Sequence, residues 1–509
     1  MMNGTLPRGF RRATVFLAVV VAQLAAQTLS PEQRTARYLD SVRQQPSLLL
    51  AFVQDMPKGG DLHNHLFGAI YAESYIRWAA QGGLCVERAS MTLVKPPCDA
   101  AAGKPPASEA LNDHVLYAQM VDAYSMRDWN AARDSGHDHF FESFYKFDAA
   151  TQGHTGDMLA EAAERAAEDH LAYLELMVTP DNDLAAQLGA RLGWNDDFAQ
   201  MRQNLLAHGL PEVIAAARKS LDVDEARMRQ DLHCGAAQAQ PGCHITVRFL
   251  YQVLRGFPPE QVFAQILTGF ELAQADSRVV GFNLVMPEDW YVPMRDFHLH
   301  MRMIDYLHRV YPRVHIALHA GELTQGMVPP EGLTFHIRDS VETGHAERIG
   351  HGVDVMYETT PIALLKEMAR RNVLVEICLT SNDLILGVRG NRHPLPIYMK
   401  YGVPVALATD DEGVSRSDMN QEYLRALETY NLSYEEIKNM ARASLEHSFL
   451  PGESLWKDAR AFRVVDACAA DSPAKSALSA ACRKFLDRSQ RAQVQWREEG
   501  EFDKFEARF

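Results

Sequence analysis

The chain has 509 residues, of which 47% are hydrophobic and 23% are charged, and its formal net charge is −15 at pH 7. This composition is typical of a globular protein with a large core and excludes a disordered chain. The negative charge argues against a nucleic-acid partner, which requires a basic surface, and favours a small neutral or cationic substrate.

Residues 1–26 have the pattern of a signal peptide. The stretch Arg8 to Arg12 is basic, an apolar run from Ala13 to Ala26 follows, and small residues precede Gln27. Because this run is short for a bilayer span, we expect it to be cleaved. The mature chain is then secreted or periplasmic, with no stable membrane association. An uncleaved membrane anchor is the alternative interpretation.

The expected elements begin with a helical segment, residues 27–56. Within it, residues 31–56 are predicted to form one helix, which ends at Pro57-Lys58-Gly59-Gly60. Short apolar runs then alternate with helical patterns such as 158–168, 259–275, 294–311 and 360–371. The expected strands are 61–66, 171–178, 245–251, 279–285, 314–318, 348–350, 373–379 and 403–408. Strands rich in Val, Ile and Leu and separated by helices predict a parallel sheet closed into a (β/α)8 TIM barrel.

Three stretches are additional to the elements that a minimal barrel needs. Residues 85–106 form a Pro-rich excursion after the first strand, and residues 222–242 form a polar excursion between the second and third strands. Helices continue beyond Met419, and the chain ends in a charged tail, 488–509. We therefore predict one catalytic domain, 57–455, with a C-terminal helical extension, 456–509.

The seven cysteines fit an exported protein. Their spacing predicts three disulfides that restrain loops, Cys85 with Cys98, Cys234 with Cys243, and Cys468 with Cys482. Cys378 lies in an apolar run and is expected to be a buried thiol. The alternative is that all seven cysteines are reduced.

Polar residues stand at the ends of the predicted strands, where TIM barrels build their active sites. They are His63 and His65 on the first strand, Gly281 on the fourth, His319 and Glu322 on the fifth, His351 on the sixth, and Asp410 with Asp411 on the eighth. Imidazoles with a carboxylate suit Zn²⁺ and leave a position open for water. Any one of these residues could instead be a core histidine or a helix cap. Together they predict a metal-dependent active site.

At these residues the sequence resembles the adenosine deaminases of the amidohydrolase superfamily. The resemblance is carried by VVGFNLV (279–285), LHAGE (318–322), RIGHG (348–352), VEICLTSN (375–382) and ATDD (408–411). It covers residues 56 to about 451. The stretch MPKGGDLH (56–63) most resembles the secreted, growth-factor-related adenosine deaminases.

The resemblance implies a reaction and a set of roles. One Zn²⁺ per chain would be held by His63, His65, His319 and Asp410. His351 and Asp410 would orient the attacking hydroxide and take its proton, while protonated Glu322 would donate to purine N1. The implied reaction is hydrolytic deamination of adenosine or 2′-deoxyadenosine to the inosine product and ammonia.

The implied substrate contacts include one departure from the family pattern. Asp411 would bind purine N7, and the backbone N–H of Gly281 would bind N3. Cytosolic adenosine deaminases have a ribose-binding aspartate in H-x-H-x-D-G-A, where this chain has Phe67. We expect Glu142, in FFESF (140–144), to contact the ribose instead. A deaminase of adenine or of a modified nucleoside is therefore an alternative.

Other functional classes differ from this one in the sequence patterns they require. A non-catalytic barrel acting as a binding or signalling protein is the alternative from a different class. A cytidine-deaminase-type enzyme needs H-x-E with P-C-x-x-C, and a serine hydrolase of the α/β type needs G-x-S-x-G; the sequence contains neither pattern. The expected partner is a small purine nucleoside, and both a monomer and a homodimer remain open.

Overall fold

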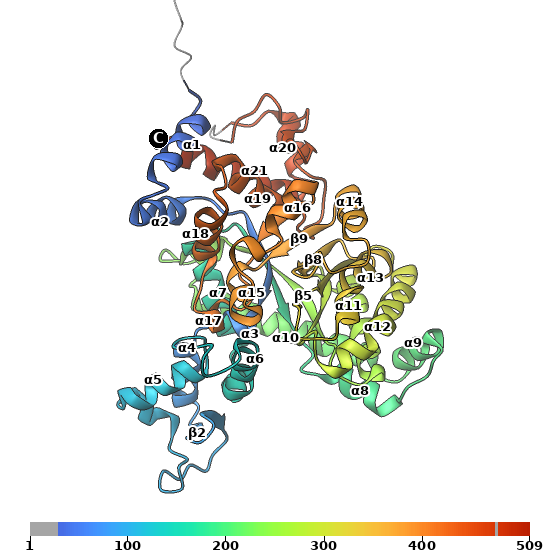
Figure 1. Ribbon diagram of the computed structural model, residues 1–509. Helices are drawn as coiled ribbons and strands as arrows, with labels where there is room; N and C mark the ends of the chain where they lie inside the picture. Colours follow the sequence, from blue (N-terminus) through green and yellow to red (C-terminus); the bar gives the residue numbers. More distant parts are fainter. Residues whose placement is uncertain (1–28, 474–476) are drawn as a thin grey trace, which may run out of the picture.

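A computed structural model describes residues 29–473 and 477–509 (Figure 1). The predicted signal peptide, 1–26, lies outside the described residues. Eight parallel strands form one sheet in the order β1-β4-β5-β6-β7-β8-β9-β10. Their bounds are β1 Gly60–His65, β4 Tyr173–Val178, β5 Thr246–Leu254, β6 Val279–Val285, β7 His315–Ala320, β8 Arg348–His351, β9 Leu374–Ile377 and β10 Val405–Leu407. Each overlaps one predicted strand, and the predicted TIM barrel is confirmed.

The sheet is nearly closed by contacts between its two edges. Asn64 in β1 forms a parallel bridge with Asp410, which follows β10. The backbone N–H of His65 donates to the Asp410 carbonyl at 3.0 Å, and the Asp410 N–H donates to the His63 carbonyl at 2.9 Å. The barrel therefore closes at the ends of the strands that carry the predicted metal ligands.

The strands are buried because both of their faces are covered. All seven residues of β6 are buried, as expected where one face lines the barrel interior and the other packs on helices. The helices of this layer are α7 Thr155–Glu168, α8 Leu184–Leu192, α9 Phe198–Ala207, α10 Leu210–Asp231, α11 Pro259–Ala275, α12 Tyr291–Val310, α13 His336–Glu342, α14 Pro361–Arg371, α15 Leu379–Leu386, α16 Leu395–Tyr401, α17 Glu412–Ser415, α18 Met419–Tyr430 and α19 Tyr434–Glu446.

The excursion after β1 projects from the barrel in Figure 1. It consists of α3 Leu66–Ala69, α4 Ala72–Gln81, β2 Cys85–Glu87, β3 Thr92–Val94, α5 His114–Ala123 and α6 Gly136–Phe147. The Cys85–Cys98 disulfide fastens its hairpin, and the Cys234–Cys243 and Cys468–Cys482 disulfides are also formed. Cys378 is a buried free thiol. These cysteine predictions are confirmed.

Two predicted boundaries are wrong. The single helix expected over 31–56 is two helices, α1 Pro31–Val42 and α2 Pro46–Asp55, because Pro46 begins a new helix and cannot continue the old one. The polar excursion expected over 222–242 starts ten residues later, since α10 continues to Asp231. Arg227 holds that last part of α10 to α7, with its Nε 2.8 Å from Asp157 Oδ1.

The C-terminal residues fold back onto the N-terminal helices. The charged stretch 488–509 contains the helix α21 Gln490–Glu506, which buries Phe502 and Phe505. Figure 1 shows α21 beside α1 and α19, and contacts join these three helices. The small elements β11 Trp456–Asp458, β12 Arg463–Val464 and α20 Ala480–Leu486 lie before α21. Within 29–473 and 477–509, no helix is long and apolar enough to cross a membrane.

Candidate active site

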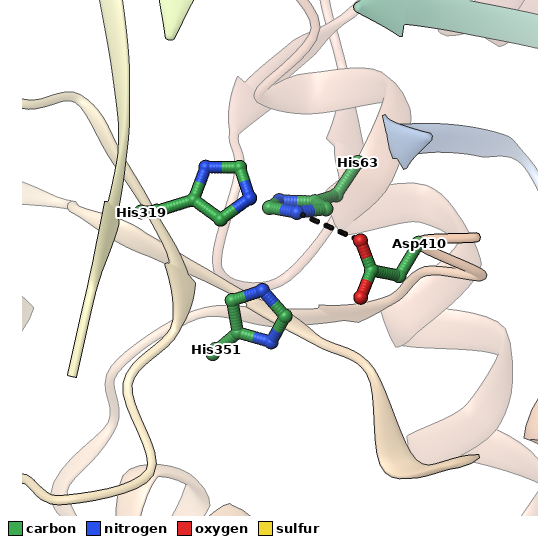
Figure 2. Close-up of side chains that lie close together, drawn as sticks. All are labelled: His63, His319, His351 and Asp410. Atoms are coloured by element: carbon green, nitrogen blue, oxygen red, sulfur yellow. Dashed lines mark ion pairs between the residues drawn. The ribbon is translucent and has the colours of Figure 1, made fainter. Parts of the chain in front are cut away.

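Four side chains from separate strands surround a common space at the C-terminal end of the barrel (Figure 2). His63 lies in β1, His319 lies in β7, His351 ends β8 and Asp410 follows β10. Each offers one ligand atom, and these atoms all lie within 4.8 Å of one another. All four residues are buried. The parallel register brings them together, because it sets the ends of neighbouring strands side by side.

His65 completes the group of imidazoles. Its Nε2 atom lies 3.1 Å from His319 Nε2 and 3.4 Å from Asp410 Oδ1. The structure thus brings together all four residues predicted to hold the metal, and it adds His351 at their side.

Each of the three predicted imidazole ligands is held at its Nδ1 atom by a polar side chain from another strand. The contacts are His63 Nδ1 to Glu376 Oε2 at 2.6 Å, His65 Nδ1 to Gln252 Oε1 at 3.2 Å, and His319 Nδ1 to Asn283 Oδ1 at 2.9 Å. Such a contact fixes the ring and the tautomer of a metal-binding histidine. It leaves Nε2 of each ring as the nitrogen that can bind a metal ion.

These residues fit a zinc ion. The buried Nε2 atoms of His63 and His351 have no hydrogen-bond partner among the described residues. A buried imidazole nitrogen without a partner is costly, and a bound cation removes that cost. Three imidazoles with one carboxylate are also a donor set that Zn²⁺ accepts, with room for a water molecule.

Glu322 lies beside this group, with its Oε1 atom 3.8 Å from His351 Nε2. Burial, and then the charge of Asp410, raises the pKa of Glu322 well above its usual range. A carboxyl group whose pKa is raised in this way is suited to act as a proton donor. Asp410 behaves in the opposite way. Burial opposes its ionisation, but the contact with His63, at 3.5 Å from Nε2 to Oδ1, and the charges of the neighbouring imidazoles lower its pKa.

His351 and Asp410 are positioned by the helix that follows β9. The Ser381 hydroxyl donates to Asp410 Oδ2 at 2.6 Å, and the Asn382 amide lies 3.0 Å from His351 Nδ1. Both His351 and Asp410 adopt left-handed backbone conformations, with φ of 67° and 61°. Such strain costs free energy and concentrates at functional sites. The motif VEICLTSN had pointed to this segment, but not to the contacts of these two side chains.

The predicted substrate-binding residues differ in how deeply they are buried. Asp411 is buried next to Gly68, where a Cβ atom would come within 1.6 Å of Asp411 Oδ1. Phe67 is partly buried, and its carbonyl accepts from the Tyr75 hydroxyl. Glu142 lies on α6, with its side chain 66% exposed and its Oε2 atom 3.9 Å from Lys146 of the same helix.

Gly281 does not lie at the end of its strand. It is the third residue of β6, and it pairs with His315, the first residue of β7. His319 is four residues further toward the mouth, about 13 Å along an extended strand. The residue that follows β6 is Met286, which has a φ of 85°. The expectation that Gly281 stands at the strand end is corrected.

Sequence reasoning missed two buried charged residues behind the turn that carries Glu322. They are Arg255, directly after β5, and Glu288, in the loop after β6. The available signal was their position: each is a charged residue that follows a predicted apolar strand.

Comparisons with known proteins agree with this geometry. A family model described as adenosine deaminase matches residues 112–457. An adenosine deaminase of Escherichia coli (strain SMS-3-5 / SECEC) is 37% identical over 140 residues, 27% of this chain and 39% of that protein. The match thus spans about two fifths of the curated relative's length.

Two solved structures share the fold. One is an amidohydrolase from Burkholderia ambifaria with bound Zn, with a TM-score of 0.53 and 16% identity, covering 88% of this chain and 95% of that chain. The other is adenine deaminase from Arthrobacter aurescens, with a TM-score of 0.50 and 19% identity, covering 78% of this chain and 94% of that chain. At these identities the likeness concerns the fold.

Proposed function

Because the chain belongs to the adenosine deaminase family, we propose that it catalyses the zinc-dependent hydrolytic deamination of adenosine or 2′-deoxyadenosine, releasing ammonia. The observation that carries this proposal is the position of Glu322. It is a buried carboxyl group whose pKa is raised by burial, beside imidazoles and a carboxylate that fit one zinc ion. A barrel that served only for binding would have no need of a proton donor at that place.

The roles of the residues follow from their contacts. His63, His65, His319 and Asp410 would hold Zn²⁺, because Asp410 Oδ1 lies 3.5 Å from His63 Nε2 and 3.4 Å from His65 Nε2, which is 3.1 Å from His319 Nε2. When bound, the ion makes a water molecule acidic enough to ionise near neutral pH. Glu322 donates its proton to purine N1, which makes C6 electrophilic. His351 and Asp410 accept the proton of the attacking water. The water oxygen bonds to C6, and the proton that His351 and Asp410 accepted passes to the amino nitrogen. The bond from C6 to that nitrogen then breaks, ammonia leaves, and the remaining hydroxyl proton returns to Glu322.

Asp411 is proposed to bind purine N7, because it adjoins Asp410 and is held against Gly68. Burial and the charge of Asp410 raise the pKa of Asp411 well above its usual range. A protonated carboxyl group can donate a hydrogen bond, and N7 is an acceptor. For the ribose we propose Glu142 as the binding residue. Its side chain lies on α6 and is mostly exposed.

A second candidate substrate is adenine or a modified nucleoside. Phe67 favours it, because an apolar side chain replaces the carboxylate that would bind a ribose hydroxyl. We also propose that residues 1–26 direct export, an idea supported by the three disulfides, which persist in oxidising compartments.

The proposed function is tested with the purified full chain. Zinc content is measured by elemental analysis, and ammonia release is followed with adenosine, 2′-deoxyadenosine, adenine and N6-methyladenosine. We expect one zinc per chain, fastest turnover of adenosine, loss of activity with a chelator and recovery with added Zn²⁺. Fastest turnover of adenine would support the second candidate. Folded protein that binds no zinc and releases no ammonia would support the non-catalytic alternative.

A further inference from the structure

The proton donor and one predicted zinc ligand lie in a single tight turn, His319 to Glu322, after β7. Gly321 in this turn has a φ of +75°, and a Cβ atom there would come within 2.4 Å of Asp354 Oδ1. Only glycine fits this position, and glycine by itself fixes no conformation. The geometry of the turn therefore depends on the groups that bond to its backbone.

Glu288 binds two successive amides of this turn. Its Oε1 atom accepts from the Gly321 N–H at 3.1 Å, and its Oε2 atom accepts from the Glu322 N–H at 2.8 Å. The Glu288 side chain is fully buried. Hydrogen bonds to a carboxylate are stronger than those between neutral groups, and using both oxygens sets direction as well as distance.

Arg255 binds the other end of the same turn. Its Nη1 donates to the His319 carbonyl at 3.2 Å. Its Nε and Nη2 donate to the carbonyl of Met286, two residues before Glu288, at 3.1 and 3.0 Å. Arg255 is completely buried, and its charge faces the carboxyl groups of Glu288 and Glu322. One guanidinium thus connects the loop that carries Glu288 to the turn that carries His319.

We propose that Arg255 and Glu288 are positioning residues that fix Glu322 relative to His319, an inference that rests on the proposed deaminase function. They hold the first carbonyl and the last two amides of the turn, so the imidazole and the carboxyl group keep one spacing. Both act through the backbone of the turn, since their hydrogen bonds to it are made with main-chain atoms. A small displacement of a reacting group can lower a rate by about 100-fold.

The test is Glu288→Gln in the zinc-loaded full chain, with Glu358→Gln as the matched control. Glu358 is also buried, but its Oε1 atom accepts from the amides of Ile337 and Arg338 in α13, at 2.6 and 3.1 Å, and not from amides of the catalytic turn. In each variant an NH₂ group replaces one carboxylate oxygen. For Glu288→Gln we expect kcat to fall by about 10- to 100-fold with KM within about threefold of wild type. For Glu358→Gln we expect both constants to stay within about threefold.

Amide hydrogen exchange gives a second measurement that does not need a reaction. The amides of Gly321 and Glu322 are expected to exchange faster in Glu288→Gln and at the wild-type rate in Glu358→Gln. If Glu288→Gln fails to fold, Arg255→Lys serves, because one ammonium cannot bridge two carbonyls as a guanidinium does. Unchanged kcat or unchanged exchange, beside an active wild type, would overturn the positioning role alone. A wild type that is inactive on every purine would overturn both the proposed function and the positioning role.

Discussion

Asn283 has a double contact with a predicted zinc ligand. Its Oδ1 atom accepts from both the backbone N–H and the Nδ1 of His319, each at 2.9 Å. Removing this acceptor frees the ring to rotate and to change its tautomer. We expect Asn283→Ala to lower zinc affinity by about 10- to 100-fold, measured by competition with a chromogenic chelator. Asn420→Ala is the control: Asn420 is also buried, but it donates to Asp169 away from the site. An equal loss of affinity in both variants would contradict the role of Asn283.

A substitution at Glu322 tests the proposed proton donor directly. Glu322→Gln keeps the size of the side chain but removes the transferable proton. Since a positioned acid contributes about 10²- to 10⁴-fold, we expect kcat to fall by that factor while zinc remains bound. Steady-state kinetics and metal analysis on the same sample check this expectation. A variant that keeps wild-type kcat with full zinc would refute Glu322 as the proton donor.

The sequence predicted the residues of the site better than the residues that position them. His63 and His65 were predicted because strand periodicity places them on one face, and Asp410 because it follows an apolar run. Glu288 and Arg255 were missed, since a position after a strand marks a charged residue but does not reveal its contacts with a distant backbone. Gly281 was misplaced because a glycine within a motif was taken to mark the strand end.

The helix α6 is held to the barrel by a histidine at its first turn. His137 Nε2 lies 3.0 Å from Asp289 Oδ1, in the loop after β6, and its Nδ1 lies 2.9 Å from Asp138. Burial opposes protonation, but these two carboxylates outweigh it and raise the pKa of His137 to about 9. Because the pKa is raised above its unfolded-state value of about 6.5, the contact stabilises the folded state fully below about pH 6.5. This stabilisation is lost as the pH rises through 9.

We therefore expect α6 to become more mobile between pH 7 and pH 10. Hydrogen exchange of residues 136–147 is measured in wild type and in His137→Gln at each pH, so that the intrinsic exchange rate cancels in the ratio. The variant should exchange faster than wild type at pH 7 and equally fast at pH 10. A ratio that does not change with pH would rule out the charge of His137 as the cause.

Strands were easier to predict than helix boundaries. An apolar run such as Val279–Val285 has only one stable place in an α/β barrel, and its predicted and observed bounds agree. The boundary of α10 depends instead on Arg227 meeting Asp157 of α7, a tertiary contact that polar composition does not reveal. The break before α2 could have been found, because Pro46 is a strong local signal.

The first and last helices of the described residues, α1 and α21, are joined through α19. Lys438 in α19 lies 3.0 Å from Glu32 of α1 and 2.5 Å from Glu506 of α21, measured from its Nζ to the carboxylate oxygens. Lys438 and Glu506 are 5% and 7% exposed, so this contact is shielded from water. The Tyr434 hydroxyl also donates to Glu506, at 3.0 Å. One lysine therefore connects the N-terminal and C-terminal helices.

We expect Lys438→Met to lower the free energy of unfolding by about 3–5 kcal/mol, because it leaves the carboxylate of Glu506 buried without its cation. Adding Glu506→Gln should recover most of this loss, since the remaining amide is neutral and can still accept from Tyr434. Urea denaturation followed by circular dichroism measures both variants. Lys504→Met, which breaks the exposed pair with Glu501, is the control and should cost less than about 1 kcal/mol. If Lys438→Met costs no more than Lys504→Met, the terminal helices are held by their apolar contacts, such as those of Phe502 and Phe505, and not by this ion pair.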